Sequence, residues 1–266
     1  MESKEKCFAL LIDADNIGSQ YIKAIIEEIA SEGVVTYKRI YGDWTSPTLK
    51  PWKDVLLEYS IIPIQQYSYT SGKNSTDSAM IIDAMDILYS GNVDGFCLAS
   101  SDSDFTRLAA RLRESGKTVI GMGKQQTPRP FVTACSRFKY IDIISKETKG
   151  DATVSLTDNQ SIEGKSMCKK SVVSDAADSS QTPESEIKET IHRLIEENSE
   201  DGEGWVLTSL IGAQLQKKYT DFDPKNYGFK KMKDLLTAWE FEIKGFQDPN
   251  NTANPSGYIM YVRNKQ

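Results

Sequence analysis

Strand-length apolar runs alternate with helical segments along the first half of the chain, and this alternation constrains the fold more than any other feature. The run CFALLID (7–13) is continuous and apolar. After it, apolar residues recur every four positions, at Ile17, Tyr21, Ile25 and Ile29. A continuous apolar run is typical of a strand buried on both faces, and the four-residue recurrence indicates a helix with one apolar face.

The same alternation continues as far as residue 144. Further strands are expected at 34–42, 61–66, 94–100 and 117–123, and helices at 51–59, 76–90 and 104–115. The segments 128–136 and 138–144 complete the pattern. Such alternation predicts an α/β fold, with a doubly wound and mostly parallel sheet covered by helices on both faces.

Composition excludes several classes of protein. The 266 residues carry a net charge of −6, so binding to nucleic acid would need a local basic patch rather than bulk charge. The four cysteines have no CxxC spacing and His192 is the one histidine, which argues against a zinc site and against a disulfide framework. No apolar run reaches the length of a secretion signal or a membrane span, so a reducing, cytoplasmic location without membrane contact is expected.

The alternation ends near Ser145, and the following stretch is rich in Ser, Thr, Asp and Lys. Such composition without periodicity predicts a flexible linker of roughly 40 residues rather than a loop inside one core. The expected organisation is a first domain at 1–145, a linker at 146–182 and a second domain at 183–266.

The second domain reads as three helices followed by two strands. The helical patterns cover 184–198, 206–219 and 226–239, and the alternating strands cover 241–247 and 257–263. Thr208 is a plausible cap of the second helix. Three helices and a hairpin are the outline of a winged helix-turn-helix domain.

Acidic residues gather where the predicted strands end. Asp13 and Asp15 follow the first strand in IDADN, and Asp77 opens the helix after the third strand. Asp102 and Asp104 follow the fourth strand in ASSDSDF. If the first and fourth strands are neighbours, as in the usual doubly wound order, Asp13 and Asp102 face each other and Asp77 closes the cluster.

Such a cluster predicts a metal centre. Carboxylates that lie close together raise each other's pKa unless a cation neutralises them. Oxygen ligands without histidine or cysteine favour Mg²⁺ or Mn²⁺, and such an ion can position a hydrolytic water against a phosphodiester.

Plainer roles fit the same residues. Asp77, Asp102 and Asp104 could cap helix N-termini, where carboxylates are favoured. Asn16 fits either the cap of the first helix or an amide that holds metal-bound waters. Two acids within the predicted helix 76–90 are expected to be solvated: Asp83 and Asp86.

Residues 7–143 resemble an NYN domain, of the PIN-like, LabA-like nuclease branch, in the motifs IDADN, TDSAMIID and ASSDSDF. The resemblance implies a PIN-like sheet and metal-dependent cleavage of RNA. It implies that the catalytic, metal-binding residues are Asp13, Asp77 and Asp102, with Asp104 as a fourth. It also implies supporting roles for Asn16 and Ser101, and a backbone or phosphate contact for Thr76.

Residues 183–263 resemble a LOTUS domain, also called OST-HTH, in the motif DFDPKNYGFKK (221–231). The resemblance implies binding of RNA, with structured and guanine-rich RNA suggested for the family, and a protein partner for some members. From 184 to 266 there are 11 basic and 14 acidic residues, so contact with RNA would depend on a local cluster. The candidates are Lys225, Tyr227, Lys230 and Lys231, with Tyr227 expected to be exposed.

In the first domain, the basic residues expected near loops at the sheet edge are Arg39, Lys73, Lys124 and Arg129. Tyr67 and Tyr69 are available to stack on bases. Each of these side chains also fits an ordinary solvated position.

Together these observations predict a Mg²⁺- or Mn²⁺-dependent ribonuclease, expected to be an endonuclease acting on single-stranded RNA. The alternative from another class is a non-catalytic adaptor that binds RNA through both domains, and a homodimer formed through the first domain stays open. A haloacid-dehalogenase-like phosphatase also has a D-x-D after the first strand. Such phosphatases usually have Thr or Val at the position of Ile17, which argues against this alternative.

Overall fold

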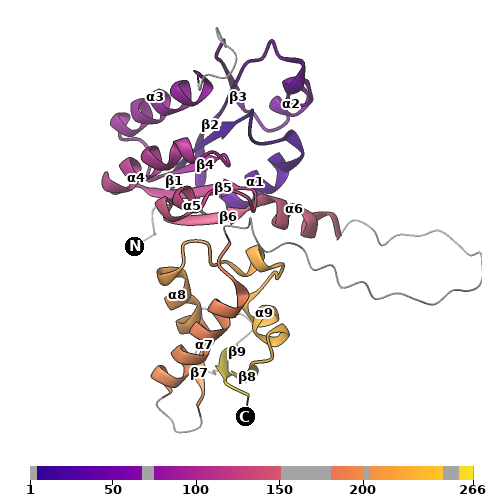
Figure 1. Cartoon of the computed structure of the whole chain (residues 1–266), viewed down its shortest axis with the longest axis vertical. Coiled ribbons are helices and arrows are strands. Elements are labelled where there is room, and N and C mark those ends of the chain that lie inside the picture. The colour runs from indigo at the N-terminus through magenta and orange to yellow at the C-terminus, as the bar shows by residue number, and fades with distance from the viewer. Residues whose placement is uncertain (1–4, 68–74, 151–180, 200–203, 248–257, 266) are drawn as a thin grey trace, which may run out of the picture.

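The computed structural model describes residues 5–67, 75–150, 181–199, 204–247 and 258–265. They form an N-terminal α/β domain, in the upper part of Figure 1, and a C-terminal domain of helices and a small sheet below it. Within the described part of the chain, no helix combines the length and the apolar character that crossing a membrane requires.

Six parallel strands form the central sheet, in the order β3-β2-β1-β4-β5-β6. Their bounds are β1 Cys7–Asp13, β2 Val34–Gly42, β3 Ile62–Gln65, β4 Gly95–Ala99, β5 Thr118–Gly123 and β6 Arg137–Tyr140. The predicted doubly wound α/β fold is confirmed. The first and fourth strands are neighbours, since Phe8 pairs with Gly95 and Ile12 pairs with Ala99.

Helices cover both faces of this sheet (Figure 1). They are α1 Ile22–Ala30, α2 Lys50–Leu56, α3 Ser75–Ser90, α4 Thr106–Glu114, α5 Arg129–Ala134 and α6 Ile141–Gly150. Short 3₁₀ turns lie at η1 Ser19–Tyr21, η2 Pro47–Leu49 and η3 Ser103–Phe105. In β1, Ala9 and Leu11 share a core with α3, α4 and α5, whereas Leu10 and Ile12 share the opposite core with α1 and α2. Because successive strand residues point to opposite faces, a strand between two helical layers must be apolar at every position.

The segment 138–144, to which the sequence pattern assigns no element type, divides between a short strand and a helix. β6 ends at Tyr140, and α6 begins at once and continues to Gly150, beyond the residue where the apolar alternation stops. Ile141 and Ile144 are buried three residues apart, which is helical spacing. Most of the predicted linker, residues 151–180, lies outside the described residues.

The C-terminal domain has the elements α7 Glu184–Asn198, β7 Val206–Leu207, α8 Thr208–Lys218, η4 Pro224–Tyr227, α9 Met232–Ala238, β8 Glu242–Gln247 and β9 Tyr258–Arg263. The strands form an antiparallel sheet in the order β7-β9-β8. Its core includes Ile191, Leu215 and Leu236. The expected cap at Thr208 is wrong: Leu207 is the N-cap residue of α8, because residues 206–207 are extended and pair with β9, and Thr208 is the first helical residue.

The C-terminal domain closes one edge of the parallel sheet. The Phe138 backbone N–H donates to the Thr220 carbonyl at 2.8 Å. The fully buried amide of Asn226 donates to the Phe138 carbonyl at 2.8 Å and accepts from the Tyr140 backbone N–H at 2.9 Å. The edge strand β6 thus finds hydrogen-bond partners in the segment 220–226 of the other domain.

Ion pairs reinforce this contact between the domains. Glu28 on α1 receives the ammonium groups of Lys139 on β6 and Lys225 on η4. Arg129 on α5 reaches the fully buried Asp221 at 3.1 Å. Burial by itself would raise the pKa of Glu28, but hydrogen bonds from the two lysines hold this pKa below its ordinary value. Glu28 is therefore charged and shared between the two domains.

Candidate metal centre

The site lies at the carboxyl ends of the neighbouring strands β1 and β4. Asp13 is the last residue of β1, and Ser100 directly follows β4. Since parallel strands end at the same edge of a sheet, the acidic residues after each strand come together there.

Asp13 is fixed beneath this edge. Its carboxylate is 1% exposed and accepts hydrogen bonds from the Asn16 amide at 2.6 Å, the Ser100 hydroxyl at 2.8 Å and the Asp15 backbone N–H at 3.1 Å. Burial raises the pKa of Asp13, and these hydrogen bonds oppose that rise. Asn16 thus holds Asp13 in place.

Ser100 is a site residue that the sequence reasoning missed. Besides donating to Asp13, its oxygen accepts the Asp102 backbone N–H at 3.0 Å, so one buried hydroxyl joins the two acidic segments. The predicted neighbour Ser101 instead accepts the Lys124 backbone N–H at 2.9 Å, and it steadies the loop after β5. The position of Ser100, directly after a buried strand and opposite Asp13, was the signal available in the sequence.

Three carboxylates come together near Asp13. One ligand oxygen from each of Asp77, Asp102 and Asp104 lies within 4.8 Å of the others. Asp77 comes from the first turn of α3, while Asp102 caps η3 by accepting the Asp104 backbone N–H at 2.9 Å. Asp102 therefore has a capping role and also belongs to the cluster. Asp13 lies outside this group of three, so four metal-bound carboxylates stay a prediction.

The negative charges of the neighbouring carboxylates act on Asp77. Burial, followed by the charges of Asp13, Asp102 and Asp104, raises the pKa of Asp77 from 3.8 to about 6. Two oxygens on opposite sides of Mg²⁺, at about 2.1 Å from it, are about 4.2 Å apart, so the spacing of these carboxylates fits a shared divalent ion. The donors are all oxygens, as Mg²⁺ and Mn²⁺ prefer.

Ionisation of Asp77 is expected to lower the free energy of unfolding of the metal-free protein as the pH rises from about 4 to about 6, whereas Glu28, whose pKa is lowered on folding, acts in the opposite direction. The pKa of Asp77 rises from 3.8 to about 6 on folding, so in this range the Asp77 carboxyl binds more protons in the folded chain than in the unfolded chain. Urea unfolding in EDTA at several pH values would measure the slope. Asp77→Asn should shift the slope of unfolding free energy against pH toward more positive values, because it removes the Asp77 contribution and leaves those of Asp13 and Glu28 in place. An unchanged slope in Asp77→Asn would contradict the prediction.

Arg39 and Asp83 form an ion pair that holds α3 on the sheet. The Arg39 guanidinium and the Tyr41 hydroxyl both donate to the Asp83 carboxylate. The expectation that Asp83 is solvated is wrong, because two side chains of β2 bind it beneath α3. This contact supports α3, whose first turn carries Asp77. The Arg39 guanidinium, which was expected to contact RNA, is instead bound to Asp83.

The other residues predicted for RNA contact in the first domain are spread over several places. Lys124 lines a hollow of about 450 Å³ together with Asn16, Ser19 and Gln20, next to the acidic edge. Thr76 is buried in the first turn of α3. Tyr67 is exposed, whereas Lys73 and Tyr69 lie outside the described residues.

Three predicted RNA contacts lie at or near the boundary between the domains. Arg129 binds Asp221 and Lys225 binds Glu28. The prediction that Tyr227 is exposed is wrong: its ring packs edge-on against Trp239, and its hydroxyl donates to the Thr182 carbonyl at 2.9 Å. Lys230 and Lys231 are exposed on the C-terminal domain.

Comparison with known families and structures gives two matches to domain families. The model of the NYN domain family matches residues 8–142, and that of the OST-HTH/LOTUS domain matches residues 180–251. A crystal structure of a protein of unknown function from Vibrio parahaemolyticus RIMD 2210633 is 21% identical, with a TM-score of 0.44, over 53% of this chain and 97% of that chain. No curated protein matches the chain.

Proposed function

The chain belongs to the NYN domain family and continues into an OST-HTH/LOTUS domain, and from this premise we propose that it is a metal-dependent ribonuclease. NYN is a nuclease-type domain and LOTUS domains bind RNA, so the two domains together favour RNA as the substrate. Single-stranded RNA cut internally is the proposed reaction, because an open acidic edge accepts a strand that can bend into it.

The meeting of Asp77, Asp102 and Asp104 carries the proposal. When bound there, Mg²⁺ or Mn²⁺ would supply charge compensation for the phosphodiester and an activated water. Asp77, Asp102 and Asp104 would hold the ion. Asp13, held in place by Asn16 and Ser100, is the acidic neighbour of this group.

One further side chain supports a role in binding the substrate. Lys124 lies beside Asn16 at the hollow next to the acids, where an ammonium group can contact a phosphate. The proposed location is a reducing, cytoplasmic compartment, which suits the free and buried thiols of Cys97 and Cys135.

Removing divalent metal is expected to abolish cleavage of labelled single-stranded RNA. The full chain in EDTA should leave the RNA intact, and added Mn²⁺ or Mg²⁺ should restore cutting. The same ions should raise the midpoint of thermal unfolding, since a ligand that binds the folded state stabilises it. Cutting that is equally fast in EDTA would contradict a metal mechanism. RNA binding without cutting under any metal would favour the adaptor.

A further inference from the structure

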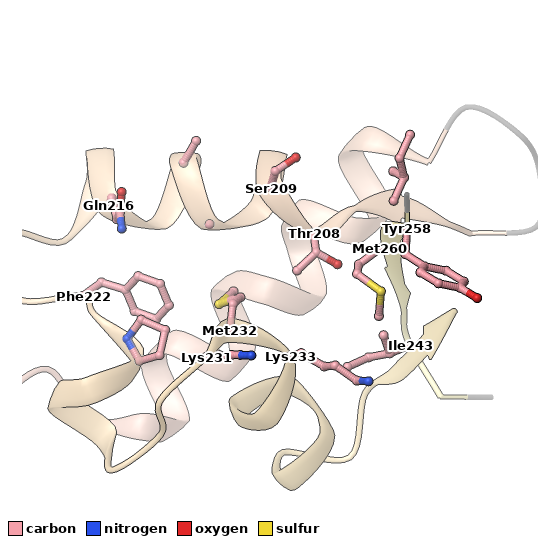
Figure 2. A pocket seen from close by; sticks show the side chains of 14 residues that line it. Thr208, Ser209, Gln216, Phe222, Lys231, Met232, Lys233, Ile243, Tyr258 and Met260 are labelled. Atoms are coloured by element: carbon pink, nitrogen blue, oxygen red, sulfur yellow. The ribbon is translucent and has the colours of Figure 1, made fainter. Parts of the chain in front are cut away.

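A hollow of about 650 Å³ lies in the C-terminal domain, far along the chain from the acidic cluster. It is bounded by α8, by the start of α9 and by the strands β8 and β9 (Figure 2). Its walls are mainly apolar, and Met232, Ile243 and Met260 contribute to them. A cavity of this size with a few polar groups is typical of a ligand site.

Thr208 gives this hollow a feature that core packing does not explain. Its residue is 8% exposed, and its hydroxyl oxygen has no hydrogen-bond partner among the described residues. Figure 2 shows the hydroxyl directed across the hollow toward Met260. A buried polar group without a partner lowers the stability of the fold. A ligand atom that forms a hydrogen bond with this hydroxyl would remove that desolvation penalty.

The charged residues around the hollow favour an anionic ligand. Lys231 and Lys233 line it, and its described lining contains no aspartate or glutamate. A second hollow, of about 630 Å³, shares four lining residues with the first: Lys233, Ile243, Tyr258 and Met260. Neighbouring hollows suit a chain-like ligand, and the ring of Tyr258, which is 54% exposed, can contact a base.

We propose that this hollow receives one unpaired nucleobase of an RNA strand, with Thr208 bonded to the base edge and Lys231 and Lys233 holding the flanking phosphates. A hydroxyl both donates and accepts, so the site tolerates different bases. The methionines pack on the faces of the base, which are apolar in every nucleotide. A base in a duplex is paired and stacked, so the site selects single-stranded or looped RNA. This inference rests on the proposed binding of RNA by the OST-HTH domain.

The test measures binding of the full chain, in EDTA, to a labelled single-stranded RNA of about 12 nucleotides and to the same RNA made abasic. The wild type should prefer the RNA with bases. Thr208→Val should weaken binding of that RNA about 3- to 10-fold and leave binding of abasic RNA unchanged. Thr208→Ser keeps a hydroxyl and should retain most of the affinity.

The lysines are tested separately with a matched pair of variants. The double variant Lys231→Gln and Lys233→Gln should reduce the slope of log affinity against log salt by about 1.4. The control, Lys217→Gln with Lys265→Gln, removes the same charge from exposed positions of the same domain that do not line the hollow, and it should change the slope less.

Three outcomes would separate the claims. Equal binding of intact RNA by the wild type and by Thr208→Val would overturn the base pocket and leave RNA binding in place. RNA binding that depends on the two lysines but is unchanged by removal of the bases would show contact with the phosphates alone, and would also overturn the base pocket. Failure of the wild-type chain to bind either RNA would overturn the proposed RNA function itself.

Discussion

Asp102→Asn is expected to slow RNA cleavage at least about 100-fold, equivalent to about 2.7 kcal/mol of transition-state stabilisation, without unfolding the protein. Asparagine keeps the side-chain oxygen, so it can still accept the Asp104 backbone N–H and cap η3. It removes the negative charge that helps to hold a divalent ion beside Asp77 and Asp104. The measurement is the cleavage rate on labelled single-stranded RNA in Mn²⁺ and in Mg²⁺.

The control for this variant is Asp86→Asn. Asp86 is an exposed acid of α3, the same helix that carries Asp77, and it lies outside the cluster of three carboxylates. It removes one charge of the same sign and should cut at the wild-type rate. Equal cutting by Asp102→Asn would place the chemistry elsewhere or reveal a contaminating nuclease. Equal loss in both variants would point to a general effect of charge rather than to a metal ligand.

Asn226→Ala is expected to lower the free energy that holds the two domains together by about 3 kcal/mol or more. The Asn226 amide donates to the Phe138 and Asp221 carbonyls and accepts from the Tyr140 backbone N–H. Phe138 and Tyr140 belong to β6, and Asp221 belongs to the segment 220–226 that contacts it. Alanine would leave these backbone groups without their partner, at about 1–3 kcal/mol for each one that stays buried. Urea unfolding should separate into two transitions, and proteolysis in the native state should become faster.

Asn198→Ala is the matched control for this substitution. Asn198 lies at the end of α7 in the same domain, and its amide donates to the Leu194 carbonyl within its own helix. It should lower stability by less than about 1 kcal/mol and leave the two domains unfolding together. If both asparagine variants unfolded alike, the docking role of Asn226 would be wrong.

Local periodicity was enough to predict the N-terminal sheet and much of its acidic edge. The apolar run of β1 and the recurrence along α1 each report on the immediate surroundings of those residues. Strand order then placed Asp77 near Asp102, because parallel strands share one carboxyl edge. A single rule of topology thus brings together residues that are separated in sequence.

Contacts between polar side chains of the two domains could not be predicted in this way. Asn226 opens the segment 226–239 that the sequence pattern predicts as a helix, and Lys225 before it was a candidate for RNA contact. Their partners Tyr140 and Glu28 lie in the other domain. A hydrogen bond over such a separation leaves no trace in the pattern of neighbouring residues. The lysine that looked available for RNA is therefore engaged by a buried glutamate.

The closed edge at β6 has a consequence for self-association. Growth of a sheet from molecule to molecule needs a pairing edge on both sides of every copy. In this chain the amide of Asn226 occupies one side, and β3 is the outer strand that pairs with β2 alone within the described sheet. Two copies joined through β3 would present the same strand to each other and form a closed pair with two-fold symmetry. With its β6 edge occupied by Asn226 and Thr220, the six-stranded sheet has only β3 left for edge-to-edge pairing within the described residues, so pairing through this sheet ends at two copies.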